Sequence, residues 1–222
     1  MMRTQSTSNE TIEMYLKTIA ELSDGGAPVI IARIAERLGI SPVSANEMMK
    51  RLGEQGLVEH VRYKGVTLTE NGRYIAHNVM RRQRLWERFL VDHLKLEWYG
   101  VYEMACRLEH ATSNVLAEAL SAYLGHPTVC PHGSPIPNSD GSLPVITTRP
   151  LTALRVGEKG FIHSIQPTTT DIYAYLNRHQ VLPNRDFTVT EIAPMEGPIT
   201  LNMAGGKVAL GRPMAELVWV SS

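Results

Sequence analysis

Apolar residues recur every three or four positions in three segments near the start of the chain. The segments are residues 11–22, "VIIARIAERLGIS", which ends just past Gly39, and "SPVSANEMMKRLGEQGLV". This spacing gives one apolar face per helix and therefore predicts three helices. Ser41 is the expected N-cap of the third helix, with Pro42 as its first residue and Gly56 as its end.

The second and third helices are separated by a turn of about three residues, which is typical of a helix-turn-helix. The next segment, "LVEHVRYKGVTLTENG", has β-forming residues on both sides of Tyr63, Lys64 and Gly65 and predicts a hairpin. Helices and hairpin together indicate a winged helix. For the helix pair alone, ordinary helix packing without DNA binding is the plainer interpretation.

Two further amphipathic segments, residues 72–94 and 101–123, predict long helices, and prolines and glycines mark an irregular linker over residues 127–144. Beyond Pro150, about five short β-rich segments and one helix over residues 169–177 predict a small barrel. The expected fold class is multidomain α+β. The predicted domains are a winged helix (1–73), a helical domain with its linker (74–144) and a β-barrel (145–222).

Composition adds limits to this picture. A chain of 222 residues accommodates two or three small domains. It has no long apolar run and no signal-peptide pattern at its start, so we expect a cytoplasmic protein with no membrane partner. Residues 1–90 hold 13 Lys and Arg against 10 Asp and Glu, a weak basic bias compatible with DNA binding.

Within "ACRLEH", a helix would place Cys106, Glu109 and His110 on one face. A thiolate, a carboxylate and an imidazole suit a transition metal, whereas Ca²⁺ or Mg²⁺ prefers oxygen alone. The alternative is a buried cysteine beside a surface Glu-His pair. Met14 lies away from the apolar stripe of its helix, where a thioether ligand and a stray surface residue are both compatible with the pattern.

A second pair, Cys130 and His132 in "VCPHGSPIP", has one residue between its members. Both types ligate metals, but two ligands do not make a site, and a proline-rich loop is more often a plain linker. Only these two cysteines are present in the chain, too few for a disulfide scaffold.

The segments "TIEMYLKTIAEL", "ARIAERLGIS", "GLVEHVRYKGVTLTENG", "VMRRQRLWERFL" and "ACRLEH" resemble, in order and spacing, the diphtheria-toxin-repressor family of iron- and manganese-dependent regulators. The resemblance covers residues 10–137 closely. Residues 150–222 resemble, more loosely, the SH3-like, FeoA-type domain of the longer members. It implies a winged-helix domain, a helical dimerisation domain, a homodimer and palindromic operator DNA, with no small-molecule substrate. It also implies repression of metal-uptake genes when metal is plentiful.

The resemblance also implies the ligands. Met14, Cys106, Glu109 and His110 match the first metal site of the iron-responsive branch. That branch has histidines where this chain has Gln83 and Tyr102, so its second site is not expected here. The manganese-responsive branch instead matches Glu87, Cys130 and His132, completed by Asp171, and Gln83 is a further candidate ligand of the first site. Two ions per subunit are expected, Mn²⁺ or, second, Fe²⁺.

For DNA, the resemblance places residues of the third helix near the groove, with basic residues of that helix and the hairpin near phosphates. The candidates are Ser41, Ser44, Asn46, Glu47, Lys50, Arg51, Arg62 and Lys64. Two alternatives remain at this point. One is a metalloenzyme with a Cys/Glu/His site, and the other is a metal-independent DNA-binding protein whose barrel binds a protein partner.

Overall fold

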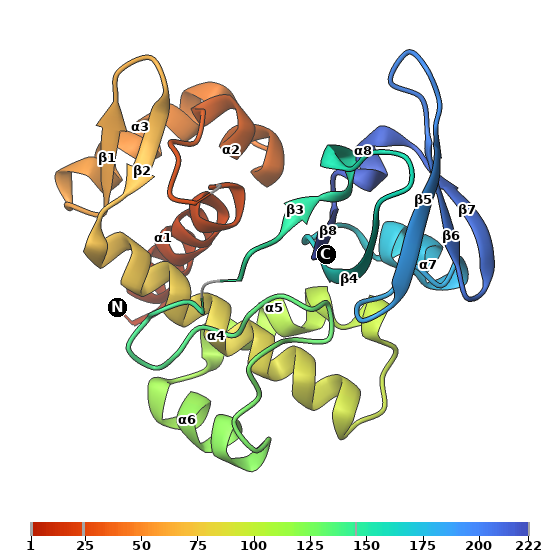
Figure 1. The fold of residues 1–222 in the computed structure, drawn as a ribbon. Helices are drawn as coiled ribbons and strands as arrows, with labels where there is room; N and C mark the ends of the chain where they lie inside the picture. The colour runs from red at the N-terminus through yellow and green to blue at the C-terminus, as the bar shows by residue number, and fades with distance from the viewer. Residues whose placement is uncertain (1, 24, 145, 222) are drawn as a thin grey trace. The chain divides into compact units, whose positions relative to one another are not determined.

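The computed structural model describes the backbone of residues 2–23, 25–144 and 146–221, with side chains from residue 9 onward within these ranges. The chain forms two compact units (Figure 1). The first comprises Met1–Arg82, Glu109–Asn114 and Pro137–Leu143. The second comprises Gln83–Leu108, Val115–Ile136 and Pro144–Ser222.

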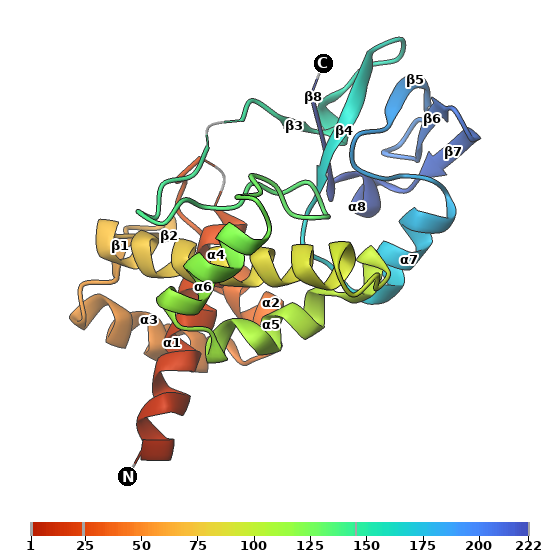
Figure 2. The ribbon, with the colours of Figure 1, turned by 90° about the horizontal axis from the view of Figure 1, so that it is seen from below.

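The first unit contains the predicted winged helix. Helices α1 (Met2–Leu22), α2 (Ile31–Leu38) and α3 (Pro42–Glu54) precede the antiparallel hairpin of β1 (Val58–Val61) and β2 (Gly65–Leu68). Their apolar faces meet in one core that includes Leu16, Ile34 and Met49. Helix α1 begins well before the hydrophobic pattern predicts, and its first turns project beyond α2 and α3 (Figure 2).

The caps of α2 and α3 follow the predicted chemistry. Gly39 ends α2 with φ of 64°, a left-handed conformation that glycine adopts without strain. Ser41 caps α3 by accepting a hydrogen bond from the backbone N–H of Ser44. Because both caps lie in the short connection, they fix the angle at which α3 leaves α2.

The long helical segments are α4 (Glu70–Asp92), α5 (Tyr102–Ala111) and α6 (Asn114–Tyr123), with a short 3₁₀ turn at Trp98–Gly100. The prediction of one helix over residues 101–123 was wrong, because the chain leaves the helix at Thr112 and Ser113. The N–H of Thr112 bonds to the carbonyl of Glu109, a tight closing turn. Glu109 and His110 therefore lie in the last turn of α5.

Residues 149–221 form the predicted small β domain in the second unit. Its antiparallel sheet has the order β3-β8-β4-β5-β6-β7, from β3 (Arg149–Pro150), β4 (Lys159–Ile165), β5 (Asp186–Ile192), β6 (Ile199–Met203), β7 (Gly206–Leu210) and β8 (Val218–Ser221). Helices α7 (Thr170–Arg178) and α8 (Arg212–Ala215) complete it. Alternate strand residues such as Ile162, Val189 and Leu201 fill its core.

The proline-rich segment after α6 is irregular, as predicted, but it is not a loose linker. Cys130, His132, Ser134 and Ile136 are all buried. The N–H of Ile165 in β4 donates to the carbonyl of His132. This hydrogen bond holds residues 130–136, called the buried loop below, against the β domain within the second unit.

Candidate metal centre

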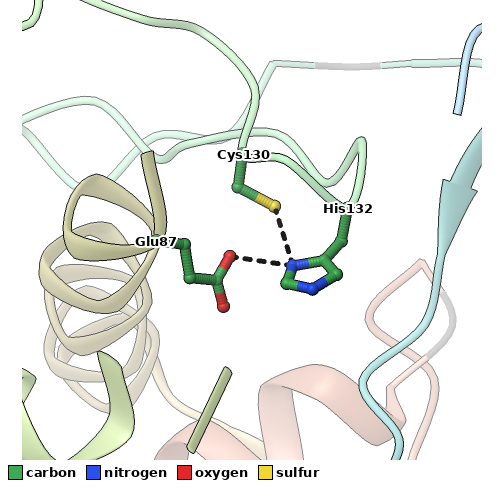
Figure 3. A group of neighbouring side chains, drawn as sticks. All are labelled: Glu87, Cys130 and His132. Atoms are coloured by element: carbon green, nitrogen blue, oxygen red, sulfur yellow. Dashed lines mark hydrogen bonds and ion pairs between the residues drawn. The ribbon is translucent and has the colours of Figure 1, made fainter. Parts of the chain in front are cut away.

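Glu87, Cys130 and His132 converge in the second unit (Figure 3). Glu87 comes from α4, and the other two come from the buried loop. One ligand atom from each lies within 4.8 Å of the other two, and all three residues are buried. A carboxylate, a thiol and an imidazole at this spacing fit a divalent transition metal ion.

The two ring nitrogens of His132 have different roles. Nε2 lies 3.0 Å from the carbonyl oxygen of Trp98, and since a carbonyl only accepts, Nε2 carries a proton. Nδ1 lies 3.1 Å from Oε2 of Glu87 and 4.0 Å from Sγ of Cys130. Nδ1 is therefore the nitrogen available to a metal ion, with the ring oriented by a backbone acceptor on its far side.

The rings of Tyr173 and Trp98 flank His132, with centroids 4.5 Å and 5.3 Å from its own. Burial alone lowers the pKa of His132, but the charge of Glu87 and the contacts with Cys130 and Glu87 outweigh it and raise the pKa to about 10. Burial likewise raises the pKa of Glu87, whereas His132 more than offsets this and the net shift is downward. The metal-free pair is thus an ion pair at neutral pH.

Glu87 is also held by its own helix. Gln83, one turn earlier on α4, donates from Nε2 to Oε1 of Glu87 at 3.1 Å and is itself buried. The prediction that Gln83 supplies an oxygen to the first site has no support in this contact, because its amide nitrogen is turned to the second ligand set. Arg84 on the same helix donates to the carbonyl of Pro135, which ties α4 to the buried loop.

Asp171 lies exposed in the first turn of α7 and is not part of the group of three. Tyr173, which does contact His132, is two residues further on, about 200° around the helix. The carboxylate and the tyrosine ring therefore leave α7 on nearly opposite sides. Ligation by Asp171 stays a prediction.

The other predicted ligand set lies along α1 and α5. Met14 is 40% exposed, as its place outside the apolar stripe predicts. Cys106 lies half-buried on α5, one turn before Glu109, which is buried. Within the described side chains, Cys106, Glu109 and His110 do not converge as closely as the group around Glu87.

Two residues of α1 instead contact Glu109 and His110. Nζ of Lys17 lies 2.9 Å from both carboxylate oxygens of Glu109. Oε2 of Glu13 lies 3.0 Å from Nδ1 of His110, and Oε1 of Glu13 accepts from Arg82 at 2.7 Å. The ammonium group of Lys17 thus occupies a position next to the carboxylate of Glu109 at which a metal cation would otherwise bind.

Glu109 and His110 of this set both hold protons more strongly than usual in the metal-free protein. Burial raises the pKa of Glu109 to about 7, although the charge of Lys17 acts in the opposite direction. The hydrogen bond with Glu13 raises the pKa of His110. With Nδ1 of His110 engaged by Glu13, Nε2, which lies 3.5 Å from Oε1 of Glu109, is the nitrogen directed to the shared ligand position.

The eight residues predicted to contact DNA are all exposed on the described surface of α3 and the hairpin: Ser41, Ser44, Asn46, Glu47, Lys50, Arg51, Arg62 and Lys64. The hydroxyls of Ser41 and Ser44 lie 2.9 Å apart, and Nδ2 of Asn46 donates to the carbonyl of Pro42. At the hairpin tip, the guanidinium of Arg62 packs 4.9 Å from the ring centre of Tyr63.

Sequence reasoning missed Lys17, Glu13, Trp98 and Tyr173. Lys17 follows Met14 by one helical turn, so its place on the ligand face was predictable from spacing alone. Glu13 carries no such signal, since its partner His110 is far away in the chain. The aromatic residues flanking His132 come from segments whose pairing depends on the tertiary fold.

Comparisons with known proteins match all three regions. Residues 8–66 match the iron dependent repressor N-terminal DNA binding domain, residues 69–138 its metal binding and dimerisation domain, and residues 149–222 the FeoA domain. The iron-dependent repressor IdeR of Mycobacterium tuberculosis is 35% identical, over 95% of this chain and 96% of its own length. The chain belongs to the iron-dependent repressor family.

The chain is also similar to other proteins of this family over nearly its whole length. The diphtheria toxin repressor of Corynebacterium diphtheriae is 33% identical, over 94% of this chain and 96% of its own. A solved manganese-dependent transcriptional repressor in complex with manganese is 37% identical and superposes with a TM-score of 0.86, over 95% of this chain and 99% of that one. ScaR with bound Zn²⁺ is 28% identical with a TM-score of 0.83, over 95% and 99%.

Membership in this family confirms several expectations from the sequence and excludes one alternative. The resemblance drawn from the motifs is confirmed, as is the fold class of winged helix, helical domain and SH3-like FeoA domain. The family consists of DNA-binding transcriptional repressors, so the metalloenzyme alternative is excluded. In the described part of the chain, no helix has the length and apolar character needed to span a membrane.

Proposed function

We propose that this repressor is a cytoplasmic homodimer that binds palindromic operator DNA when loaded with two divalent ions per subunit, Mn²⁺ before Fe²⁺. The observation that carries the proposal is the buried convergence of Glu87, Cys130 and His132. Three side chains of types that ligate metals come together there from a helix and a distant loop. Without metal, Glu87 and His132 form an ion pair, and a divalent ion would use the same group of three as ligands.

The first ion would be held by Met14, Cys106, Glu109 and His110, and the second by Glu87, Cys130 and His132, with Asp171 as a further ligand. A bound divalent ion supplies a cross-link between segments that are distant in the chain. Around the first ion, α1 of the winged-helix domain is joined to α5. Around the second, Tyr173 and the backbone of β4 carry the FeoA domain against the ligand loop.

The preference for manganese rests on relatives, because a carboxylate, an imidazole and a thiol do not by themselves select manganese over iron or zinc. Two solved relatives described as manganese regulators, a repressor in complex with manganese and SloR, superpose on this chain with TM-scores of 0.86 and 0.82. Because N/O/S sites favour Cu²⁺ and Zn²⁺ in affinity, the metal that the cell supplies also decides.

On DNA, α3 is the element that enters the major groove, with Glu47 able to accept from a cytosine amino group and Asn46 able to read adenine. Lys50 and Arg51 on α3, and Arg62 and Lys64 on the hairpin, reach phosphates. A symmetric dimer calls for half-sites about one helical turn, or a multiple of it, apart. Repression of metal-uptake genes at high metal is the expected outcome.

The proposal is tested by a crystal grown with Mn²⁺ and measured with anomalous scattering. We expect two anomalous peaks per subunit, one at Oε of Glu109 and Nε2 of His110 and one at Nδ1 of His132. A crystal soaked with Ca²⁺ at equal concentration, measured at a wavelength where Ca²⁺ scatters anomalously, is the control and should show neither peak, because Ca²⁺ prefers oxygen ligands alone. A single peak, or peaks at surface carboxylates alone, would contradict the proposed sites.

A further inference from the structure

Lys17 forms a buried ion pair with Glu109 in the first unit. Its ammonium is 2.9 Å from both carboxylate oxygens, and the two side chains are only 8% and 2% exposed. A surface ion pair of this kind would contribute little, but a buried carboxylate needs a cation close by. Lys17 supplies that charge to Glu109 from a separate helix.

The ammonium of Lys17 lies close to the proposed first metal site. Lys17 lies one helical turn after Met14 on α1, so the thioether and the ammonium leave the helix on one face. Oε1 of Glu109, which accepts from Lys17, is also the oxygen that lies 3.5 Å from Nε2 of His110. The lysine thus shares a carboxylate oxygen with the ligand set.

Two cations that share one buried carboxylate repel each other strongly, because water does not screen them there. A divalent ion on Glu109 therefore requires Lys17 to move away or to give up one of its two contacts. Nearby negative charge does not remove this conflict. Glu13 is already paired with Arg82 and His110, and Glu21 acts on Glu109 through space.

We propose that Lys17 is a built-in counter-cation that competes with the divalent ion for Glu109 and so sets the metal concentration at which the repressor responds. This inference rests on the proposed function. Without metal, the lysine holds α1 against α5 through both carboxylate oxygens of Glu109. With metal, its displacement is part of the binding equilibrium, so it weakens metal binding and protects the metal-free fold.

The test measures Mn²⁺ binding directly, by the paramagnetic resonance signal of the free hydrated ion, in the full-length wild type and in Lys17→Met. We expect the first class of sites in Lys17→Met to bind about tenfold or more tightly, within the range that neighbours of metal ligands exert. The sites at Glu87, Cys130 and His132 should be unchanged, which provides an internal reference. Lys17→Arg, which keeps the charge, should bind like the wild type.

A second measurement distinguishes a specific effect on metal binding from poor folding of the variant. Lys17→Met and the more polar Lys17→Gln should both unfold at a lower temperature than the wild type without metal, and Mn²⁺ should raise their melting temperature by more than it raises that of the wild type. Unchanged or weaker Mn²⁺ binding in both neutral variants would overturn the inference and leave Lys17 a purely structural partner. If instead the wild type itself fails to bind Mn²⁺, the proposed function fails.

Discussion

At the residue scale, His132 and Glu87 determine what the second ligand set does without metal. The pKa of His132, ordinarily 6.5, is raised to about 10, so the stability it contributes is complete below about 6.5 and is lost as pH rises through 10. The pKa of Glu87 is lowered, so its contribution is present above the ordinary value of 4.5 and is lost as pH falls through the lowered folded pKa. The metal-free ion pair therefore stabilises the fold throughout the neutral range.

Replacing His132 with Leu leaves the carboxylate of Glu87 buried without its cation. We expect the free energy of unfolding of the metal-free protein to fall by about 3–5 kcal/mol at pH 7. The deficit should shrink as the pH approaches 10, because the wild type then loses the same ion pair. Urea unfolding at pH 7 and pH 10 measures it. Arg88→Ala, which removes a partly exposed i,i+4 pair with Asp92 on the same helix, should cost at most about 0.5 kcal/mol.

Metal binding at Nδ1 of His132 must displace the proton that Glu87 holds there. We therefore expect the affinity of this site for Mn²⁺ to rise with pH between 6 and 8, by about tenfold per pH unit for each proton displaced. Competition with a chelator of known affinity at each pH gives the slope. Because the thiol of Cys130 also releases a proton on binding, the slope is compared with that of Cys130→Ala, and a slope of zero in this variant would show that His132 is already neutral in the metal-free protein, against the ion pair described above.

At the element scale, the sequence predicted the winged helix and the small β domain, because these depend on local periodicity and on short motifs. It did not predict the break between α5 and α6, since the apolar spacing continues across Thr112 and Ser113. It also described the segment around Cys130 and His132 as a linker. Prolines mark irregular backbone, but only tertiary contacts decide whether irregular backbone is buried.

Gly133 provides a test of how tightly this loop is held. Its φ is +83°, and a Cβ there would stand 2.0 Å from the carbonyl oxygen of His163 in β4. We expect Gly133→Ala to lower the free energy of unfolding by about 3 kcal/mol or more and to weaken Mn²⁺ binding at His132. Gly125→Ala is the matched control, because Gly125 has φ of +72° but open space around it, and it should cost only about 1 kcal/mol. Thermal unfolding and Mn²⁺ titration of both variants compare the two costs.

At the scale of the whole molecule, the proposed homodimer needs an apolar surface. Val115, Leu116 and Tyr123 on α6 are 81%, 44% and 64% exposed, within the region that matches the dimerisation domain. Large exposed apolar side chains gathered on one helix are typical of a protein interface. The amphipathic sequence of this region already predicted apolar surface available to a partner.

We expect the double substitution Val115→Lys and Leu116→Lys to convert the dimer to a monomer, because each buried lysine would have to lose its water shell at the interface. Sedimentation velocity across a range of protein concentrations measures the shift. Val156→Lys changes a residue that is 59% exposed outside this region and should leave the dimer intact. A double variant that stays dimeric would place the interface elsewhere on the chain.

The central claim is that divalent metal bound at both ligand sets is what allows this repressor to hold its operator. The most direct measurement is fluorescence anisotropy of a duplex selected from a random pool by the Mn²⁺-loaded protein, recorded against free Mn²⁺ for the wild type, Cys106→Ala and Cys130→Ala. The account predicts binding by the wild type that chelator abolishes, and a much higher Mn²⁺ requirement in each variant. Equal binding by all three proteins, in chelator and in Mn²⁺ alike, would contradict it and leave a DNA-binding protein that does not sense metal.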